Sequence, residues 1–435
     1  MGERELVDAQ RAGHPVPAAP GRPLFPWLVL GLSFALLLSD FMCRQVLAAV
    51  FPFLKTQWAL TDTQLGGLSS VVALTVGVLT LPLSMLADRF GRRRAILGMA
   101  VVWSLATLAS ALAAGYGQLL AARVFIGAGE AAYGSVGLAV VLSVFPAHRR
   151  AALSGTFTAG GSFGSALGIA LGGALAVRYG WRWSVVTMAL TGLVLAVLYR
   201  QLVTDAKLAR HAHPEPGGPA DPDPGPTGRS RLAALLSSPA VLCAYVGGGL
   251  QLFVAGTLLA WLPSYVHRAY GLPPGAAAAL ASLLLLGMAV GMIGCGLLSD
   301  RLARSAPVRM WTTAMGYAAA SLLLLGVGFA LPPGPAQLAL IGAGAFFAAG
   351  ITGPTGALVA GLTPAPVRAG ALGMLALSYN LLGLSAGPLV IGMLADRLGL
   401  TAAMRLAPAI SLAVLAVLAV GRRAYPASVR RAARR

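Results

Sequence analysis

The sequence predicts an all-α membrane protein with twelve transmembrane helices arranged as two six-helix repeats. Of its 435 residues, 57% are hydrophobic and 10% are charged, whereas a soluble domain has roughly 25% charged residues. Apolar runs of about twenty residues recur, each long enough to cross roughly 30 Å of hydrocarbon as a helix. The composition excludes an ordinary soluble enzyme and a disordered chain, and three cysteines cannot form a disulfide scaffold.

Five segments follow from the hydrophobic runs and the polar stretches between them. A polar N-terminal tail covers 1–25, a first six-helix bundle covers 26–202, a Pro-rich linker covers 203–235, a second bundle covers 236–421 and a basic tail covers 422–435. The expected spans are 27–50, 64–86, 95–115, 118–143, 151–176, 184–202, 240–264, 276–298, 309–330, 337–361, 370–394 and 402–420. The proline runs at 213–226 do not support a helix.

The net charge of +19 indicates membrane topology rather than nucleic-acid binding. If both termini lie on one side of the membrane, that side carries 24 basic residues and the other carries 6. This asymmetry is the positive-inside pattern. We therefore expect a monomeric, multi-pass protein of the bacterial inner membrane with both termini in the cytoplasm. Its Arg-rich end should contact anionic lipid headgroups.

The two halves repeat one another. The matching groups are Pro52 with Pro263, Asp88-Arg89 and Arg92 with Asp300-Arg301 and Arg304, 126–129 with 341–344, 146–155 with 364–373, and 164–180 with 383–399. The offset grows slowly from 211 to 219 residues. Parallel repeats of this kind build transporters that rock about a site near the membrane midplane.

Several motifs resemble those of a known family. Residues 84–94 read SMLADRFGRRR and resemble the signature between helices 2 and 3 of the major facilitator superfamily, while GLLSDR at 296–301 resembles its second-half copy. Arg123 with GAGEAAY at 127–133, RQVL at 44–47 and DTQLG at 62–66 are most similar to the spinster-like branch. The resemblance implies the major facilitator fold with alternating access. Cys43 stands where that branch usually has aspartate, and Asp40 stands where asparagine is expected.

The paired signatures predict a gate at the cytoplasmic ends of the helices. Its residues are Asp88, Arg89, Arg92, Asp300, Arg301 and Arg304. An aspartate there can accept hydrogen bonds from a neighbouring helix N-terminus, whose free amides and dipole favour negative charge. The alternative is that these charges only anchor the topology.

Few acidic residues remain as candidates for a coupling site. Of the 13 acids, only Asp40 and Glu130 lie inside the predicted spans away from their ends, whereas Asp62 and Asp396 lie near the outer face. A charge inside the membrane costs at least about 2.5–3.5 kcal/mol, so these acids should be neutral or paired. Arg44 follows Asp40 by four residues and Arg123 precedes Glu130 by seven, so each arginine shares a helix face with an acid.

This arrangement suits proton coupling, because burial disfavours a charged carboxylate and a nearby arginine favours it. We expect Glu130 to bind and release the proton, while Arg123 and Arg44 adjust its proton affinity and attract an anionic substrate. Asp40 either replaces the acid missing at position 43 or leaves coupling to Glu130 alone. A static packing network of the four residues is the remaining alternative.

Charge is confined to the first half. The second half offers Gln251, Tyr379 and Asn380, with an apolar wall that includes Phe346, Phe347 and Met374. A cavity that is charged on one side and apolar on the other favours an amphiphile such as a lysophospholipid-type anion. Tyr133 is a further substrate-binding candidate, whereas packing is the favoured role of Phe346 and Phe347.

Glycines at 160, 164, 168 and 172 predict close helix packing in the fifth span. The histidines do not form a metal-ligand pattern, so neither metal nor cofactor is expected, and the absence of a Walker A motif argues against ATP as the energy source. The sequence thus predicts a proton-coupled transporter of an organic or lipid-like anion. Alternatives are an exporter of hydrophobic drugs, a symporter of small organic acids and a non-transporting receptor.

Overall fold

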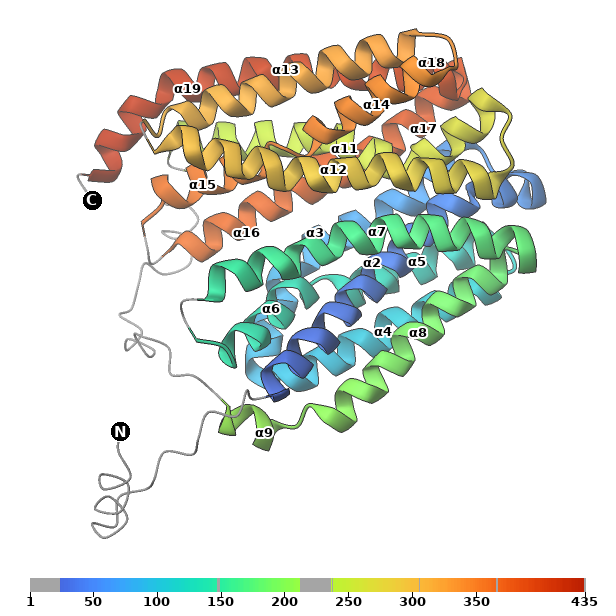
Figure 1. Ribbon diagram of the computed structural model, residues 1–435, viewed down its shortest axis with the longest axis horizontal. Helices are drawn as coiled ribbons and strands as arrows, with labels where there is room; N and C mark the ends of the chain where they lie inside the picture. Colours follow the sequence, from blue (N-terminus) through green and yellow to red (C-terminus); the bar gives the residue numbers. More distant parts are fainter. Residues whose placement is uncertain are drawn as a thin grey trace, which may run out of the picture.

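The computed structural model describes residues 24–146, 149–211, 236, 238–304, 306–364 and 367–433. Regular structure in these residues is helical throughout, with twelve stretches long and apolar enough to cross a membrane. Figure 1 shows two bundles, one blue to green and one yellow to red, lying side by side with their helices along a common direction. The predicted fold is confirmed.

The N-terminal half contains α2 (Leu24–Trp58), α3 (Asp62–Phe90), α4 (Arg92–Leu112), α5 (Tyr116–Glu130), α6 (Tyr133–Ser143), α7 (Arg150–Tyr179) and α8 (Trp181–Leu202), and is followed by the short helix α9 (Asp205–Arg210). The C-terminal half contains α11 (Pro239–Tyr270), α12 (Pro274–Ala303), α13 (Arg309–Ala330), α14 (Pro335–Ala348), α15 (Thr352–Leu362), α16 (Arg368–Ser378), the π-helical segment η3 (Tyr379–Ser385), α17 (Ala386–Leu398), α18 (Leu400–Leu406), η4 (Ala407–Ala409) and α19 (Ile410–Ala433). The proline runs at 213–226 lie outside the described residues.

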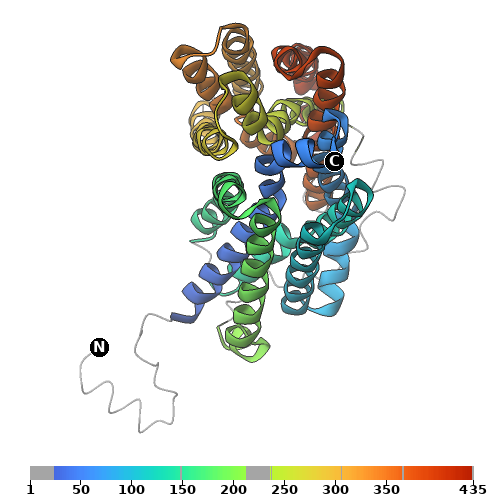
Figure 2. The ribbon, with the colours of Figure 1, turned by 90° about the vertical axis from the view of Figure 1, so that its right-hand side faces the viewer.

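The start of α2 and the end of α19 lie at the same end of the molecule, on the left in Figure 1. We call this the termini end and the opposite end, near α18, the distal end. Figure 2 shows the two bundles as separate groups of helices that meet along one face. Contacts between the halves are made chiefly by α7 with α12 and by α3 with α17.

Equivalent glycines form the same joint in both halves. Gly180 links α7 to α8 with φ of 87°, and Gly399 links α17 to α18 with φ of 81°. Glycine adopts such positive values without steric cost. The two residues correspond in the sequence repeat, so the duplication extends to the backbone conformation of this turn.

The fourth and tenth spans are each interrupted, although the sequence predicted them as continuous. The chain leaves the α-helix after Glu130 and resumes it at Tyr133, and the other break lies between α14 and α15. Glycine-rich sequence weakens both helices. Side-chain hydroxyls satisfy freed carbonyls, since Thr80 Oγ1 donates to the Ala131 oxygen (2.8 Å) and Thr352 Oγ1 to that of Ala349 (2.9 Å). The first break leaves Glu130 at the buried C-terminal end of α5.

The glycine stripe of α7 packs against α2 with a matching spacing of four residues. A β-carbon at positions 160, 164, 168 and 172 would meet Phe34, Leu38, Met42 and Val46, respectively. At Gly164 and Gly168 the obstacle is α2 backbone, at 2.7 and 2.8 Å. The stripe therefore lets two helix backbones approach closely and fixes the depth of α2 within the bundle.

We expect Gly168→Ala to destabilise the protein by about 1–3 kcal/mol, because its added methyl group overpacks a rigid backbone contact. The measurement is thermal unfolding in detergent. Gly155→Ala on the same helix is the matched control, because a β-carbon there meets nothing within 4 Å. Equal unfolding temperatures for the two variants would contradict the packing role.

Candidate functional site

Two buried acids lie together between α2 and α5. Asp40 and Glu130 are only 5% and 6% exposed, and their carboxyl groups lie within hydrogen-bonding reach of one another. Arg44 Nη1 lies 3.9 Å from Glu130 Oε2. The other oxygens, Asp40 Oδ1 and Glu130 Oε1, are buried and have no hydrogen-bond partner among the described residues. The sequence predicted this group from the scarcity of acids within the spans.

Arg123 is held by backbone oxygens of two neighbouring helices. Its Nε donates to the Leu68 oxygen (3.1 Å), Nη2 to that of Arg44 (3.1 Å) and Nη1 to that of Cys43 (3.5 Å). The side chain is buried, with 2% of the residue exposed. Its positive charge is therefore fixed in place by α2 and α3, and this anchoring to carbonyls was not predicted.

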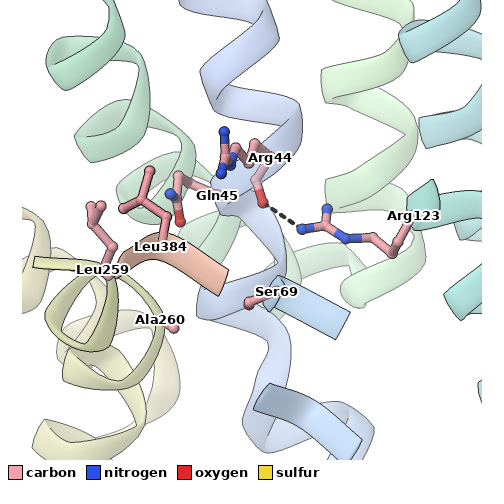
Figure 3. Close-up of a pocket in the computed structure, with 8 residues that line it drawn as sticks. Arg44, Gln45, Ser69, Arg123, Leu259, Ala260 and Leu384 are labelled. Atoms are coloured by element: carbon pink, nitrogen blue, oxygen red, sulfur yellow. Dashed lines mark hydrogen bonds between the residues drawn. The ribbon is translucent and has the colours of Figure 1, made fainter. Parts of the chain in front are cut away.

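A narrow cavity lies beside this group, between the two halves, and offers about 20 Å³ to a water-sized sphere. The N-terminal half contributes Arg44, Gln45, Ser69 and Arg123, and the C-terminal half contributes Gly256, Leu259, Ala260 and Leu384 (Figure 3). The dashed line in Figure 3 marks the hydrogen bond from Arg123 to the Arg44 oxygen. The cavity is polar and positive on one side and apolar on the other.

Two predicted substrate contacts lie inside their own bundles. Tyr133 is fully buried and its hydroxyl donates to the Ser33 oxygen (2.7 Å). Gln251 is also fully buried; its Oε1 accepts from Ser411 Oγ (3.2 Å) and its Nε2 donates to the Ala348 oxygen (3.4 Å). In this conformation both side chains pack within their own bundles and do not line the cavity.

The other two predicted contacts belong to the π-helical segment η3. Tyr379 shares a 2.6 Å hydrogen bond with Thr355, and Asn380 Nδ2 donates to the Ala376 oxygen (3.0 Å). Asn380 Oδ1 has no partner among the described residues. Leu384, on the same segment, lines the cavity. Because π-helical turns are frequent at functional sites, η3 is the part of the second half most closely tied to the cavity.

The apolar residues expected in the second half do not line this cavity. The rings of Phe346 and Phe347 contact each other edge-on, with their centroids 5.1 Å apart. Phe347 stacks on Tyr317 with the ring centroids 6.1 Å apart. The apolar wall is formed instead by Leu259, Ala260 and Leu384. No group of three or more His, Cys, Asp or Glu side chains in the described part of the chain could hold a metal ion.

The predicted gate residues lie at the termini end, on α3, α4 and α12. Arg89, Arg92, Asp300, Arg301 and Arg304 are exposed, and the side chain of Asp88 lies outside what the structure describes. Arg93, within the first signature, donates to the Arg200 oxygen (3.0 Å) and pairs with Asp205 of α9 (3.2 Å). The first signature is thus joined to the segment that leads from α8 into α9.

A second charge group joins the halves at the distal end. Asp62 begins α3 and accepts two hydrogen bonds from Arg268 of α11 (2.7 and 2.8 Å) and one from Lys55 of α2 (2.7 Å). The Asp396 carboxylate of α17 accepts hydrogen bonds from the backbone amides of Asp62 (2.7 Å) and Thr63 (2.8 Å). A carboxylate from one half therefore caps a helix of the other, where the dipole favours negative charge.

Close backbone contacts complete the distal closure. A β-carbon at Gly66 of α3 would lie 3.0 Å from the carbonyl carbon of Pro388 on α17. A β-carbon at Gly392 would lie 3.2 Å from Thr63 Cα. The sequence placed Asp62 and Asp396 near the outer face without assigning a role to either. The Asp-Arg pair at 396–397 has the same residues as the pair at 88–89. This likeness was the one feature of the sequence that pointed to Asp396.

We expect Arg268→Gln to weaken the distal closure by about 2 kcal/mol or more, because the Asp62 carboxylate loses its charged partner from the other half. Spin labels at Thr56 and Thr401, exposed positions of opposite halves, would report a longer distance population. Arg397→Gln is the control, since that side chain is exposed beside Asp396. An unchanged distance distribution in Arg268→Gln would show that apolar packing alone closes this end.

Known proteins share this architecture. The chain is 26% identical to the hexuronate transporter of Bacillus subtilis over 60% of this chain and 61% of that protein, and 26% identical to human protein spinster homolog 1 over 70% and 60%, respectively. It is also 26% identical to an Escherichia coli D-galactonate transporter over 94% of this chain and 98% of that protein. The first two relatives thus match over about three fifths of their length.

A solved structure of a bacterial homolog of the human lysosomal transporter Spinster, in an inward-facing and unoccupied conformation, aligns with a TM-score of 0.81. The alignment covers 94% of this chain and 99% of that one at 19% identity, and so shows the fold. The family model for the Major Facilitator Superfamily matches residues 33–348, well over half of the chain. With twelve spans, two repeated halves and a cavity between them, the chain belongs to the major facilitator superfamily of membrane transporters.

Proposed function

We propose that the protein is a proton-coupled secondary transporter that moves an organic anion, with a lysophospholipid-type anion as the preferred class. The observation that carries the proposal is the contact between Asp40 and Glu130, two buried carboxyl groups beside two arginines that line the cavity between the halves. Membership of a transporter family supports the transport step, and the hexuronate and galactonate transporters among the relatives support an anionic cargo.

The charges of the cluster explain how proton and anion would be coupled. Two adjacent carboxyl groups are most stable when they share one proton, because two like charges repel at short range. With Arg44 and Arg123 positive, the cluster then carries a net charge of +1. Binding a monovalent anion neutralises it, whereas losing the shared proton removes the positive charge that attracts the anion. The proton and the anion therefore favour each other's binding, as reciprocal linkage requires.

Net charge also governs which states can change conformation. A cluster with proton and anion both bound is neutral and can pass through the closed, low-dielectric state at small cost. A state with the proton alone retains an unbalanced positive charge in the membrane interior, which is costly. Movement of proton and anion together follows from this difference.

Sidedness is proposed from the basic residues. The termini end, which carries most of them, is assigned to the cytoplasm by the positive-inside rule. The distal closure at Asp62, Arg268 and Asp396 would then seal the outer side. A closed distal end on the outer side is what an inward-facing state requires.

Two observations favour different sizes of anion. The apolar surface of Leu259, Ala260 and Leu384 suits an acyl chain beside a charged head. The hexuronate and galactonate transporters among the relatives favour a sugar acid instead. The cavity offers only about 20 Å³ to a water-sized sphere, far below the volume of a ligand site, so it must widen before either anion enters. Both classes share the anionic group that would contact Arg44.

The test uses proteoliposomes containing the full chain. Uptake of lysophosphatidylglycerol, galactonate, glucuronate and a cationic dye is compared with and without an acidic outside medium. Acid-stimulated uptake of one of the anions supports the proposal, and the active anion identifies the class. Transport of the dye alone would replace the proposal with drug export, and binding without transport would replace it with a receptor.

We expect Glu130→Gln to abolish pH-driven uptake while leaving anion exchange between equal concentrations intact. The amide preserves the shape of the side chain but cannot release a proton, so only the coupled step is lost. Glu215→Gln, in the Pro-rich linker, is the matched control. Normal pH-driven uptake by Glu130→Gln would refute its role.

Asp40 and position 43 can be tested as alternatives for one acid. We expect Asp40→Asn to lose most pH-driven uptake, because the shared proton requires two carboxyl groups. Adding Cys43→Asp to this variant should restore part of the activity, since position 43 lies one turn away on α2 and beside the same cluster. Full driven uptake by Asp40→Asn would mean that Glu130 couples alone.

A further inference from the structure

Unpaired polar side chains gather inside the N-terminal bundle, away from the cavity. Ser33 and Ser39 of α2, Trp103 and Ser104 of α4, and Tyr199 of α8 are at most 2% exposed. The Oγ atoms of the three serines, the Trp103 Nε1 and the Tyr199 hydroxyl lack a hydrogen-bond partner among the described residues. Buried polar groups of this kind are normally satisfied by ordered water. Where several of them lie close together, they indicate a small polar space inside the bundle.

Three of these atoms face the same small space beside Gly192 of α8. A β-carbon on Gly192 would lie 3.0 Å from Ser39 Oγ and 3.3 Å from Trp103 Nε1, and would collide with Ser104 Oγ. Ser39 precedes Asp40 directly, and its hydroxyl lies next to the Cys43 thiol, which is within electrostatic range of Asp40 and Glu130. The absence of a side chain at position 192 therefore keeps polar atoms accessible to one another close to the acidic pair.

The polar groups continue from this space toward the termini end. The Tyr199 hydroxyl lies near the Ser33 hydroxyl. It is also close enough to Arg93 and Asp205 to interact electrostatically with both. The Tyr133 hydroxyl donates a hydrogen bond to the Ser33 carbonyl oxygen. It is close enough to Asp40 and Tyr199 to interact electrostatically with both. The side chain of Asp205 is 65% exposed, so the series ends at solvent.

Positions along the helices place these groups at successive depths. At a rise of about 1.5 Å per residue, Tyr199 lies about 5 Å, Ser33 about 14 Å, Ser104 about 18 Å and Asp40 about 24 Å from the termini end of its own helix. The groups thus span the distance from the loop surface to the acidic pair.

We propose that this series is a proton route between the termini end and the Asp40–Glu130 pair, separate from the substrate cavity. The proposal rests on the proposed proton coupling. Each hydroxyl or water accepts a proton on its oxygen and passes its own proton onward, so no group is consumed and the net charge of the route is unchanged. Trp103, which can only donate, orients a neighbouring oxygen. The acidic pair could then exchange its proton while an anion fills the cavity.

The experiment combines Tyr199→Phe, which removes one hydroxyl, with Gly192→Ala, whose methyl group fills the shared space. Matched controls are Tyr179→Phe, an exposed tyrosine, and Gly155→Ala, which faces open space. For each variant, pH-driven uptake and equal-concentration exchange are measured with lysophosphatidylglycerol, galactonate and glucuronate. We expect driven uptake to fall several-fold in both variants while exchange and both controls remain at the original rate.

A second measurement does not depend on the substrate. After a rapid pH change, the carbonyl stretch of the buried carboxyl groups is followed by infrared spectroscopy, with Glu130→Gln identifying the band. The route predicts slower protonation in Tyr199→Phe and Gly192→Ala. Unchanged protonation in both variants, or equal loss of driven uptake and exchange in both, would overturn it. If the original protein shows no pH-driven uptake at all, the proposed coupling fails, whereas slowed protonation would still support the route.

Discussion

The structure depends on keeping four ionisable side chains stable where water is scarce. Asp40 and Glu130 contact one another, Arg44 lies beside them, and Arg123 is fixed by carbonyl oxygens of α2 and α3. Removing charges from water is costly unless they are paired and hydrogen-bonded. Close packing of α7 on α2 and the interruption after Glu130 both position these groups. The packing of the bundle is therefore arranged around this cluster of opposite charges.

The central cluster and the distal closure share the same helices. α2 carries Asp40 and Arg44 and, further along, Lys55, while α11 carries cavity residues and Arg268. A displacement of either helix that separates charges in the central cluster therefore also moves charges in the distal closure. This connection links occupation of the cavity to the state of the distal end without requiring a separate signalling element.

Hydrophobic length, repeated motifs and the scarcity of acids were enough to predict the twelve spans and the acidic pair, because each depends on local composition. The breaks after Glu130 and Ala348 were not predicted, because the apolar runs continue across both of them and their length gives no sign of an interruption. The distal contacts of Asp62 join residues more than 200 positions apart, and no periodicity reports such pairing. Gln251 and Tyr133 were sensible candidates by residue type, but their partners lie within their own bundles.

The cavity lining divides two tasks between the duplicated halves. Polar and charged groups come from the first half, whereas Gly256, Leu259, Ala260 and Leu384 come from the second. Substitutions in the second half can change the shape presented to a cargo without touching the ionisable cluster. Such a division allows the apolar side of the cavity to diverge among descendants of one ancestral transporter while the charged cluster is inherited intact.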